Sequence, residues 1–282
     1  MSKIAISCDT TAALSKQQIK ELGIFVLPLN VIVDDKEYHD TVDIYPEMLA
    51  KMMRGGSSIK TSTPSPVEVY DFFDKIFAKG YEKIIHFTIS SKLSSIYNMF
   101  TLLCKEKYGD KVIIVDALSV CTYMGATVQH AVKLNNAGVA PEEIAKECIA
   151  RQGCENIYFI PESLTYLKRG GRISPAAAAF GNLLGIKPVL RFNKGAIEKE
   201  TTTRSVKQFL PNIVANFKSK NYDPKKWDIH IVIFDCPTIA NLVNESMKEN
   251  FPEYKIIVSP ISINVCAHCG PGTIGIGFTL KD

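Results

Sequence analysis

The 282-residue sequence contains little that would mark a membrane, nucleic-acid-binding or disordered protein. Its most apolar stretch, Pro175 to Leu190, is broken by glycine, asparagine, lysine and proline. It therefore falls short of the roughly 18 uninterrupted apolar residues that span a bilayer. A net charge of +4 and a single tryptophan argue against nucleic-acid binding, and 46% hydrophobic residues are typical of a globular protein. We expect neither a transmembrane segment nor a nucleic-acid partner.

A secretion signal is also missing from the N-terminal residues, so we expect a cytoplasmic protein. In that compartment the eight cysteines are expected to be free thiols. Six of them are scattered, and we expect small buried side chains at these positions: Cys8, Cys104, Cys121, Cys148, Cys154 and Cys236.

Familiar catalytic and nucleotide-binding motifs are absent as well. The sequence has no G-x-S-x-G nucleophile elbow, no P-loop and no HExxH. Gly270, Gly272 and Gly275 match G-x-G-x-x-G, but the next residues predict a strand where the dinucleotide motif needs a helix. We expect no metal and no nucleotide cofactor.

The first half of the chain alternates short apolar runs with helical patterns, which is typical of a parallel α/β sheet. The predicted strands are Ile4–Cys8, Phe25–Val33, Lys83–Ile89 and Val112–Val115. The predicted helices are Pro66–Ala78, Ser95–Tyr108, Tyr123–Asn136 and Pro141–Gln152.

The second half predicts a mixed α/β arrangement. Its strands are expected at Ile157–Ile160, Pro188–Phe192, Ile229–Phe234, Lys255–Pro260 and Thr273–Leu280, with helices at Ser205–Lys218 and Thr238–Asn250. We therefore predict one α/β domain over residues 1–282 with two lobes, 1–155 and 156–282. The boundary is soft because no linker-like segment separates the lobes.

Two hydroxyl-rich segments stand close to predicted helix starts. Ser65, Pro66 and Glu68 form a capping box, so the hydroxyls of Thr61 and Ser62 would lie near a helix N-terminus that can hold an anion. The alternative is plain capping by Ser65, with residues 61–63 as a loop.

The second segment, Ile89 to Tyr97, follows a predicted strand at the end where open α/β sheets bind ligands. Its four serines offer donors to a carboxylate or phosphate, and Ser94 could also cap the next helix.

Positive charge is concentrated between Lys168 and Lys207, where nine Lys and Arg residues face two Glu. This basic stripe suits an anionic ligand or an acidic partner, although a solvated surface would look the same. Within it, Gly170 and Gly171 let the chain turn and present Arg172, a side chain suited to carboxylate or phosphate.

The last segment places His268 beside three glycines. A histidine in such a loop can donate a hydrogen bond to an anion. Cys266 and Cys269 form C-x-x-C, which could be a redox pair or half of a zinc site, but no second cysteine pair with zinc spacing exists.

In this order and spacing, Thr-Ser-x-Pro-Ser, Ile-Ser-Ser-x-Leu-Ser, Tyr-Leu-Lys-x-Gly-Gly-Arg-Ile and His-x-Gly-Pro-Gly resemble the DegV family of bacterial fatty-acid-binding proteins. The resemblance covers essentially the whole chain. It implies a two-lobed lipid carrier, not an enzyme, that holds a long-chain fatty acid, such as a 16- or 18-carbon acid, in an apolar tunnel. The carboxylate of this ligand would lie at the interface between the lobes. It also implies a separate ATP-dependent fatty acid kinase that makes acyl phosphate for phospholipid synthesis.

The resemblance also assigns residues. The carboxylate donors would be Thr61, Ser62, Ser94 and His268, and Ser95 stands where the family usually has glycine and could add a contact.

Arg172 matches the arginine of the family's Gly-Gly-Arg-Ile motif, and Arg204 falls in the segment that the resemblance associates with partner docking, so both are candidate kinase-facing residues.

Two other functions compete with the carrier. A lipid hydrolase or acyl transferase could use His268 with a nearby serine, although no orienting acid can be assigned. A metal- or redox-linked protein could use Cys266 and Cys269.

Overall fold

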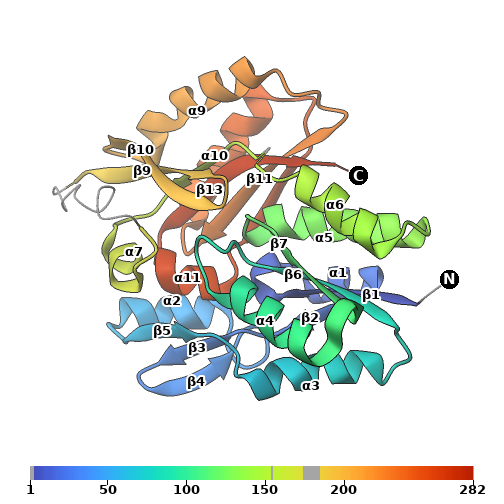
Figure 1. The fold of residues 1–282 in the computed structure, drawn as a ribbon. Coiled ribbons are helices and arrows are strands. Elements are labelled where there is room, and N and C mark those ends of the chain that lie inside the picture. The colour runs from blue at the N-terminus through green and yellow to red at the C-terminus, as the bar shows by residue number, and fades with distance from the viewer. Residues whose placement is uncertain (1–2, 154, 174–184, 282) are drawn as a thin grey trace.

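Three β-sheets organise the chain in the computed structural model, which describes residues 3–153, 155–173 and 185–281. The strand orders are β2-β1-β6-β7, β4-β3-β5 and β10-β9-β8-β13-β11-β12. The first two sheets build the N-terminal lobe, and the third builds the C-terminal lobe (Figure 1). The predicted two-lobed α/β class is confirmed.

The four-stranded sheet is entirely parallel and has helices on both faces. Its strands are β1 (Ile4–Asp9), β2 (Phe25–Leu27), β6 (Lys83–Thr88) and β7 (Val112–Asp116). Alternate side chains point to opposite faces, so Ala5 and Ile84 pack with α3 and α4, whereas Ile6 and Ile85 pack with α1, α5 and α6. These helices are α1 (Lys16–Leu22), α3 (Pro66–Phe77), α4 (Ile96–Tyr108), α5 (Cys121–Asn136) and α6 (Pro141–Ala150).

A small antiparallel sheet departs from the prediction. The apolar run Phe25–Val33 is not one strand, because it divides at Pro28 into β2 and β3 (Asn30–Val33), which belong to different sheets. β3 pairs with β4 (Lys36–His39) and with β5 (Ile59–Ser62). Thr61 and Ser62 therefore lie in a strand rather than in a loop. Helix α2 (Pro46–Arg54) packs beside this sheet.

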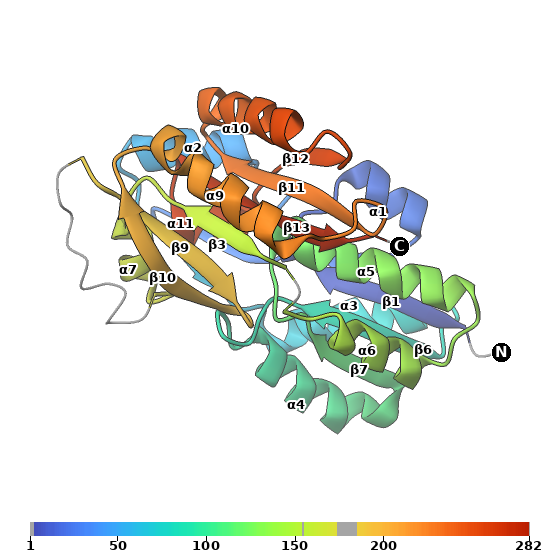
Figure 2. The same cartoon turned by 90° about the horizontal axis from the view of Figure 1, so that it is seen from above.

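The six-stranded sheet is mixed, because β11 and β12 run parallel and the other neighbours antiparallel. Its strands are β8 (Ile157–Ile160), β9 (Lys187–Asn193), β10 (Ala196–Thr203), β11 (Trp227–Phe234), β12 (Ile256–Pro260) and β13 (Thr273–Leu280). Seen from above, α9 (Val206–Lys220) and α10 (Pro237–Asn250) lie side by side over it (Figure 2).

Three short helical segments connect the sheets near the lobe interface. They are the 3-10 turn η1 (Thr10–Ala12) and the helices α7 (Thr165–Gly170) and α11 (Ile263–Cys269); another 3-10 turn, η2 (Gly109–Lys111), precedes β7. Sequence periodicity did not predict α7 or α11, because each is shorter than two full turns. Both turn out to carry residues of the candidate site.

The cysteines in the described ranges match the expectation of buried thiols. Cys8, Cys104, Cys121, Cys148 and Cys236 are all buried and unbridged. Cys154 lies outside the described residues, as does most of the apolar stretch from Pro175. None of the described helices has the length and apolar character needed to cross a bilayer.

The glycines of β13 serve packing in the middle of a sheet. Gly275 and Gly277 lie within this strand, so the expected strand in place of a nucleotide-binding helix is confirmed. A Cβ atom on Gly277 would come within 2.7 Å of Ile157 Cγ1 and 3.0 Å of its Cα. β8 and β13 can therefore approach as they do only with glycine at this position.

We predict that Gly277→Ala destabilises the protein. Alanine would gain roughly 0.5–1 kcal/mol over glycine within a strand. Overpacking against Ile157 should cost about 1–3 kcal/mol, which exceeds this gain, so the free energy of unfolding should fall. Urea unfolding should show a lower midpoint, while Thr202→Ala at an exposed position of β10 should stay within about 0.5 kcal/mol. An unchanged midpoint for Gly277→Ala would show that the strands can separate without cost.

Candidate functional site

The buried carboxylate of Asp9 fixes the ends of two neighbouring parallel strands. It accepts hydrogen bonds from the backbone N–H groups of Thr11, at 2.8 Å, and Ile89, at 2.9 Å. Burial raises the pKa of Asp9 to about 6, although these hydrogen bonds oppose the shift. Asp9 thereby positions Thr11 and Ile89, which both line the cavity between the lobes.

This interlobe cavity has a volume of about 60 Å³. Its walls come from η1, the segment after β6, strands β5, β8 and β10, and helices α7 and α11. Most of its lining is apolar, and its polar members are Thr11, Thr61, Ser94, Arg172, Asn264 and His268. Three of the five predicted carboxylate donors, Thr61, Ser94 and His268, are thus brought to one place.

The central contact of the cavity is the 2.8 Å hydrogen bond between Thr61 Oγ1 and His268 Nε2. His268 lies in the last turn of α11, so the expectation that it sits in a glycine loop is wrong. The other side of its ring faces Gly170, where a Cβ atom would lie only 2.2 Å from Nδ1. Glycine at position 170 therefore makes room for the imidazole.

His268 is neutral at physiological pH. Burial lowers its pKa to about 4, and the positive charge of Arg172 adds to the shift. A neutral imidazole has one donor and one acceptor nitrogen. When Nε2 carries the proton, it donates to Thr61 and leaves the threonine hydroxyl free to donate to a ligand.

The two predicted serines at the start of α4 are placed differently. Ser94 is half-buried and lines the cavity, and its Oγ accepts a 3.3 Å hydrogen bond from Ile96 N. Ser95, not Ser94, is the N-cap residue, and it is exposed and outside the cavity lining.

Ser62 points away from the cavity because of strand geometry. Successive side chains of a strand face opposite sides of the sheet. Thr61 pairs with the buried Val31 and faces His268, whereas Ser62 pairs with Asn30 on the outer face. The predicted hydroxyl pair therefore contributes one member, Thr61, to the cavity.

Arg172 lies in the wall of the cavity. Gly171, with φ of +67°, ends α7 and turns the chain so that Arg172 Nε donates a 3.0 Å hydrogen bond to Leu93 O. Its guanidinium also donates to Gly170 O. Arg172 thus connects the loop before Ser94 with the residues that hold His268.

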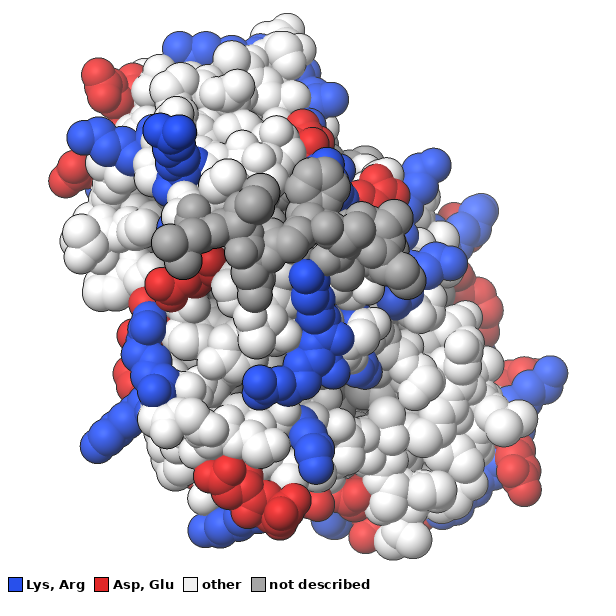
Figure 3. Space-filling view, turned by 90° about the vertical axis from the view of Figure 1, so that its left-hand side faces the viewer, with Lys and Arg blue, Asp and Glu red and all other residues white. Residues whose placement is uncertain are grey.

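Arg204 is exposed and lies away from the cavity, in a separate surface depression with Thr203 and Gln208. On the face that carries α7 and the β9–β10 hairpin, Lys and Arg side chains gather near the centre (Figure 3). The basic segment from Lys168 to Lys207 supplies α7, β9 and β10.

Sequence reasoning missed Asn264 and Phe159 as cavity residues. Asn264 is buried in α11, and its Nδ2 has no hydrogen-bond partner among the described residues. No motif signals this residue, because α11 is too short to show a helical period. Phe159 is an ordinary strand residue in the sequence, and only the fold places it in the cavity wall.

A wider depression of about 840 Å³ opens on the other side of η1. It is lined by charged residues that include Asp9, Asp40, Lys16 and Lys255. Burial raises the pKa of Asp40 to about 7. None of the predicted head-group residues lines this depression.

The geometry does not support the two competing functions. His268 bonds a threonine, and its Nδ1 faces Gly170 rather than a carboxylate that could orient the ring for nucleophilic catalysis. Cys266 and Cys269 are buried, and burial raises the pKa of Cys266, which disfavours a reactive or metal-binding thiolate.

The fold and the cavity together define a two-lobed α/β binding protein with hydroxyl, imidazole and guanidinium groups set into an apolar interlobe pocket. A family model described as "Uncharacterised protein, DegV family" matches residues 3–281. The chain belongs to the DegV family.

Relatives with known names and structures resemble the whole chain. A DegV domain-containing protein of Clostridium perfringens is 31% identical, covering 99% of this chain and 98% of its own. The solved structure of a DegV family protein from Thermus thermophilus, described as fatty acid binding, has a TM-score of 0.89 at 26% identity and 99% coverage of each chain. A Thermotoga maritima protein described as revealing fatty acid binding function has a TM-score of 0.83 at 25% identity, covering 99% of this chain and 100% of its own.

We predict that Gly170→Ala releases His268 from Thr61 without removing a polar group. The new methyl group would overlap Nδ1, so the ring must move toward solvent and its pKa should rise from about 4 toward 6.5. NMR titration of the His268 ring measures this shift.

The wild-type protein should also lose stability as the pH falls from 6.5 toward 4, because only the unfolded state binds the proton in that range. This loss should be smaller for Gly170→Ala. Identical His268 titrations in the two proteins would mean that the ring keeps its buried position.

Proposed function

We propose that this protein binds a long-chain fatty acid between its lobes. The carboxylate would accept hydrogen bonds from Thr61 and Ser94, and from His268 where its Nε2 donates to the ligand in place of Thr61, and the acyl chain would lie among the apolar cavity residues. The observation that carries the proposal is the Thr61–His268 hydrogen bond inside a mainly apolar interlobe cavity. The fatty-acid-binding relatives in the same family support it.

The two parts of the ligand would contribute differently. Each hydrogen bond to the charged carboxylate gives roughly 1.5–3 kcal/mol. Each buried methylene adds about 0.8 kcal/mol, so the tail of a 16- or 18-carbon acid supplies most of the gross binding energy. Ordering and desolvation offset much of this gain. The head group therefore fixes the orientation of the ligand, and the tail supplies the affinity.

Arg172 would supply the positive charge near the carboxylate, because His268 is neutral. Its guanidinium lies in the cavity wall, and its charge already influences His268. Asn264 Nδ2 is a further donor in the same wall. Together these residues offer the carboxylate one cation and several neutral donors.

Binding would require the cavity to expand. Its volume of about 60 Å³ is well below the roughly 300–1,000 Å³ that is usual for ligand pockets. Apolar side chains from the two lobes, such as Leu93 and Phe159, would have to separate around the acyl chain. The bound lipid would then replace their mutual contacts with contacts of its own.

We further propose that the protein is a cytoplasmic carrier and not itself an enzyme. It would present the carboxylate to a separate ATP-dependent kinase, and the acyl phosphate would serve phospholipid synthesis. Arg172 and Arg204 are the docking candidates, because the basic segment gives this face a charge that suits an acidic partner surface (Figure 3).

We predict that Thr61→Ala combined with Ser94→Ala sharply reduces fatty acid retention. The double variant removes two donors to the carboxylate, so affinity should fall by at least about tenfold. Mass spectrometry of an organic extract of the purified protein measures the amount of bound lipid. Thr101→Ala, an exposed hydroxyl on α4, is the matched control. Equal lipid content in all three proteins would refute the head-group assignment.

We predict that Arg204→Glu leaves lipid retention intact and slows the partner kinase. Arg204 is remote from the cavity, so charge reversal should act on docking and lower kcat/KM by roughly tenfold. Lys248→Glu, an exposed residue on α10, provides a control for the change in net charge. Normal turnover with Arg204→Glu would remove this residue from the docking surface.

A further inference from the structure

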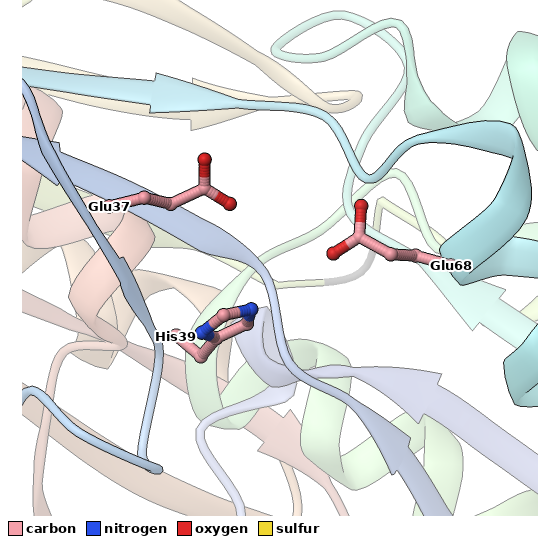
Figure 4. Close-up of side chains that lie close together, drawn as sticks. All are labelled: Glu37, His39 and Glu68. Atoms are coloured by element: carbon pink, nitrogen blue, oxygen red, sulfur yellow. The ribbon is translucent and has the colours of Figure 1, made fainter.

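A group of potential metal ligands lies outside the cavity, on the outer face of the small antiparallel sheet. Glu37 and His39 of β4 and Glu68 of α3 point toward one another (Figure 4). One ligand atom from each residue lies within 4.8 Å of the other two. None of these residues takes part in the interlobe site.

The backbone of β4 fixes the direction of two of the three side chains. Glu37 and His39 are two positions apart on β4, so their side chains share one face of the strand. Glu68 is the third residue of α3, where its carboxylate accepts hydrogen bonds from Ser65 N and Oγ in a capping box. One carboxylate oxygen of Glu68, Oε2, is thereby anchored.

A buried amide provides an independent sign of a ligand. Asn30 stands directly opposite His39 in the β3–β4 pair and is 3% exposed. Its side chain hydrogen-bonds with Glu68, which contributes to lowering the pKa of that carboxyl. Its Oδ1, however, has no hydrogen-bond partner among the described residues. A buried acceptor without a donor therefore lies on a side chain that bonds to one of the three cluster residues.

His39 is also oriented as metal-binding histidines are. Its Nδ1 lies 3.5 Å from a carboxylate oxygen of Asp43, and its backbone N–H donates to the same side chain at 2.6 Å. A carboxylate on one ring nitrogen fixes the ring and increases the basicity of the other nitrogen. Nε2 is then the nitrogen that would bind a metal.

We propose that Glu37, His39 and Glu68 bind one divalent transition-metal ion, with Zn²⁺ as the best match. Imidazole with carboxylates suits Zn²⁺, whose tetrahedral bonds of about 2.0–2.2 Å place ligand atoms about 3.3–3.6 Å apart. Small side-chain rotations close the present separations to this range. A bound water would complete the coordination.

The ion would connect the edge strand β4 to the start of α3. β5 lies beyond β3 in the same sheet, and the segment after it leads directly into α3. The metal site would therefore brace the outer face of a sheet whose inner face carries Thr61. The site does not depend on fatty acid binding, so it can be tested separately.

The test is calorimetric titration of Zn²⁺ into untagged full-length protein that has been treated with a chelator. We expect one tight equivalent. Glu37→Gln and Glu68→Gln should each weaken it by at least about tenfold. Glu68→Gln is informative because glutamine also serves in a capping box, so the start of α3 is retained. Glu249→Gln, an exposed residue on α10, is the matched control and should bind as the wild type does.

Thermal unfolding provides a second measurement. Zn²⁺ should raise the melting temperature of the wild type and of Glu249→Gln, but not of Glu37→Gln, because a ligand stabilises only a state that binds it. Equal Zn²⁺ binding in all variants would place the metal elsewhere, and absence of binding in the wild type would refute the site. Binding of Ca²⁺ or Mg²⁺ in preference to Zn²⁺ would overturn the choice of a transition metal.

Discussion

The hydrogen bond between Thr61 and His268 joins positions that are 207 residues apart in the chain. One partner belongs to a small antiparallel sheet, and the other to a short helix that precedes the last strand of the C-terminal lobe. The surrounding elements make room for this hydrogen bond and hold the walls around it. Gly170 leaves space for the imidazole, α7 packs against α11, and Asp9 holds the strand ends that form the opposite wall. A single polar contact in an apolar setting thereby defines where a ligand head group can lie.

The electrostatics of this region follow from burial more than from net charge. His268 loses its proton because water is excluded and Arg172 is near, so the imidazole acts as a neutral hydrogen-bonding group. Burial raises the pKa of Asp9, because a buried carboxylate is costly, and the hydrogen bonds from backbone N–H groups partly compensate for the lost water. In the proposed fatty acid complex, the positive charge near the carboxylate would therefore come from the arginine in the cavity wall, Arg172.

The sequence predicted most strands and long helices that have a clear apolar pattern, but it missed β10 and α2 as well as several shorter elements. The strands Ile157–Ile160 and Thr273–Leu280 have the predicted bounds, and Ser65 caps α3 as its motif indicates. Strands β4 and β5 are polar at most positions, unlike the equally short but apolar β8, and the one- to two-turn helices α7 and α11 are too short for a hydrophobic period to appear. Thr61, Ser94 and His268 could be grouped through their motifs. Asn264 and the direction of Ser62 could not, because both depend on elements that only the tertiary structure defines.

Side chains alternate between the two faces of β5, so the register of this strand against β3 decides which of them face the cavity. Two residues with hydroxyl groups, Thr61 and Ser62, stand side by side on opposite faces, so a shift of one residue would still place a hydroxyl in the cavity. The same shift would move the buried Ile59 out to solvent and draw the exposed Lys60 into the core. The apolar-then-charged pair at the start of the strand therefore selects which hydroxyl faces His268. In the proposed complex, Ile59 and Lys60 would therefore help to decide which hydroxyl meets the ligand head group without approaching it themselves.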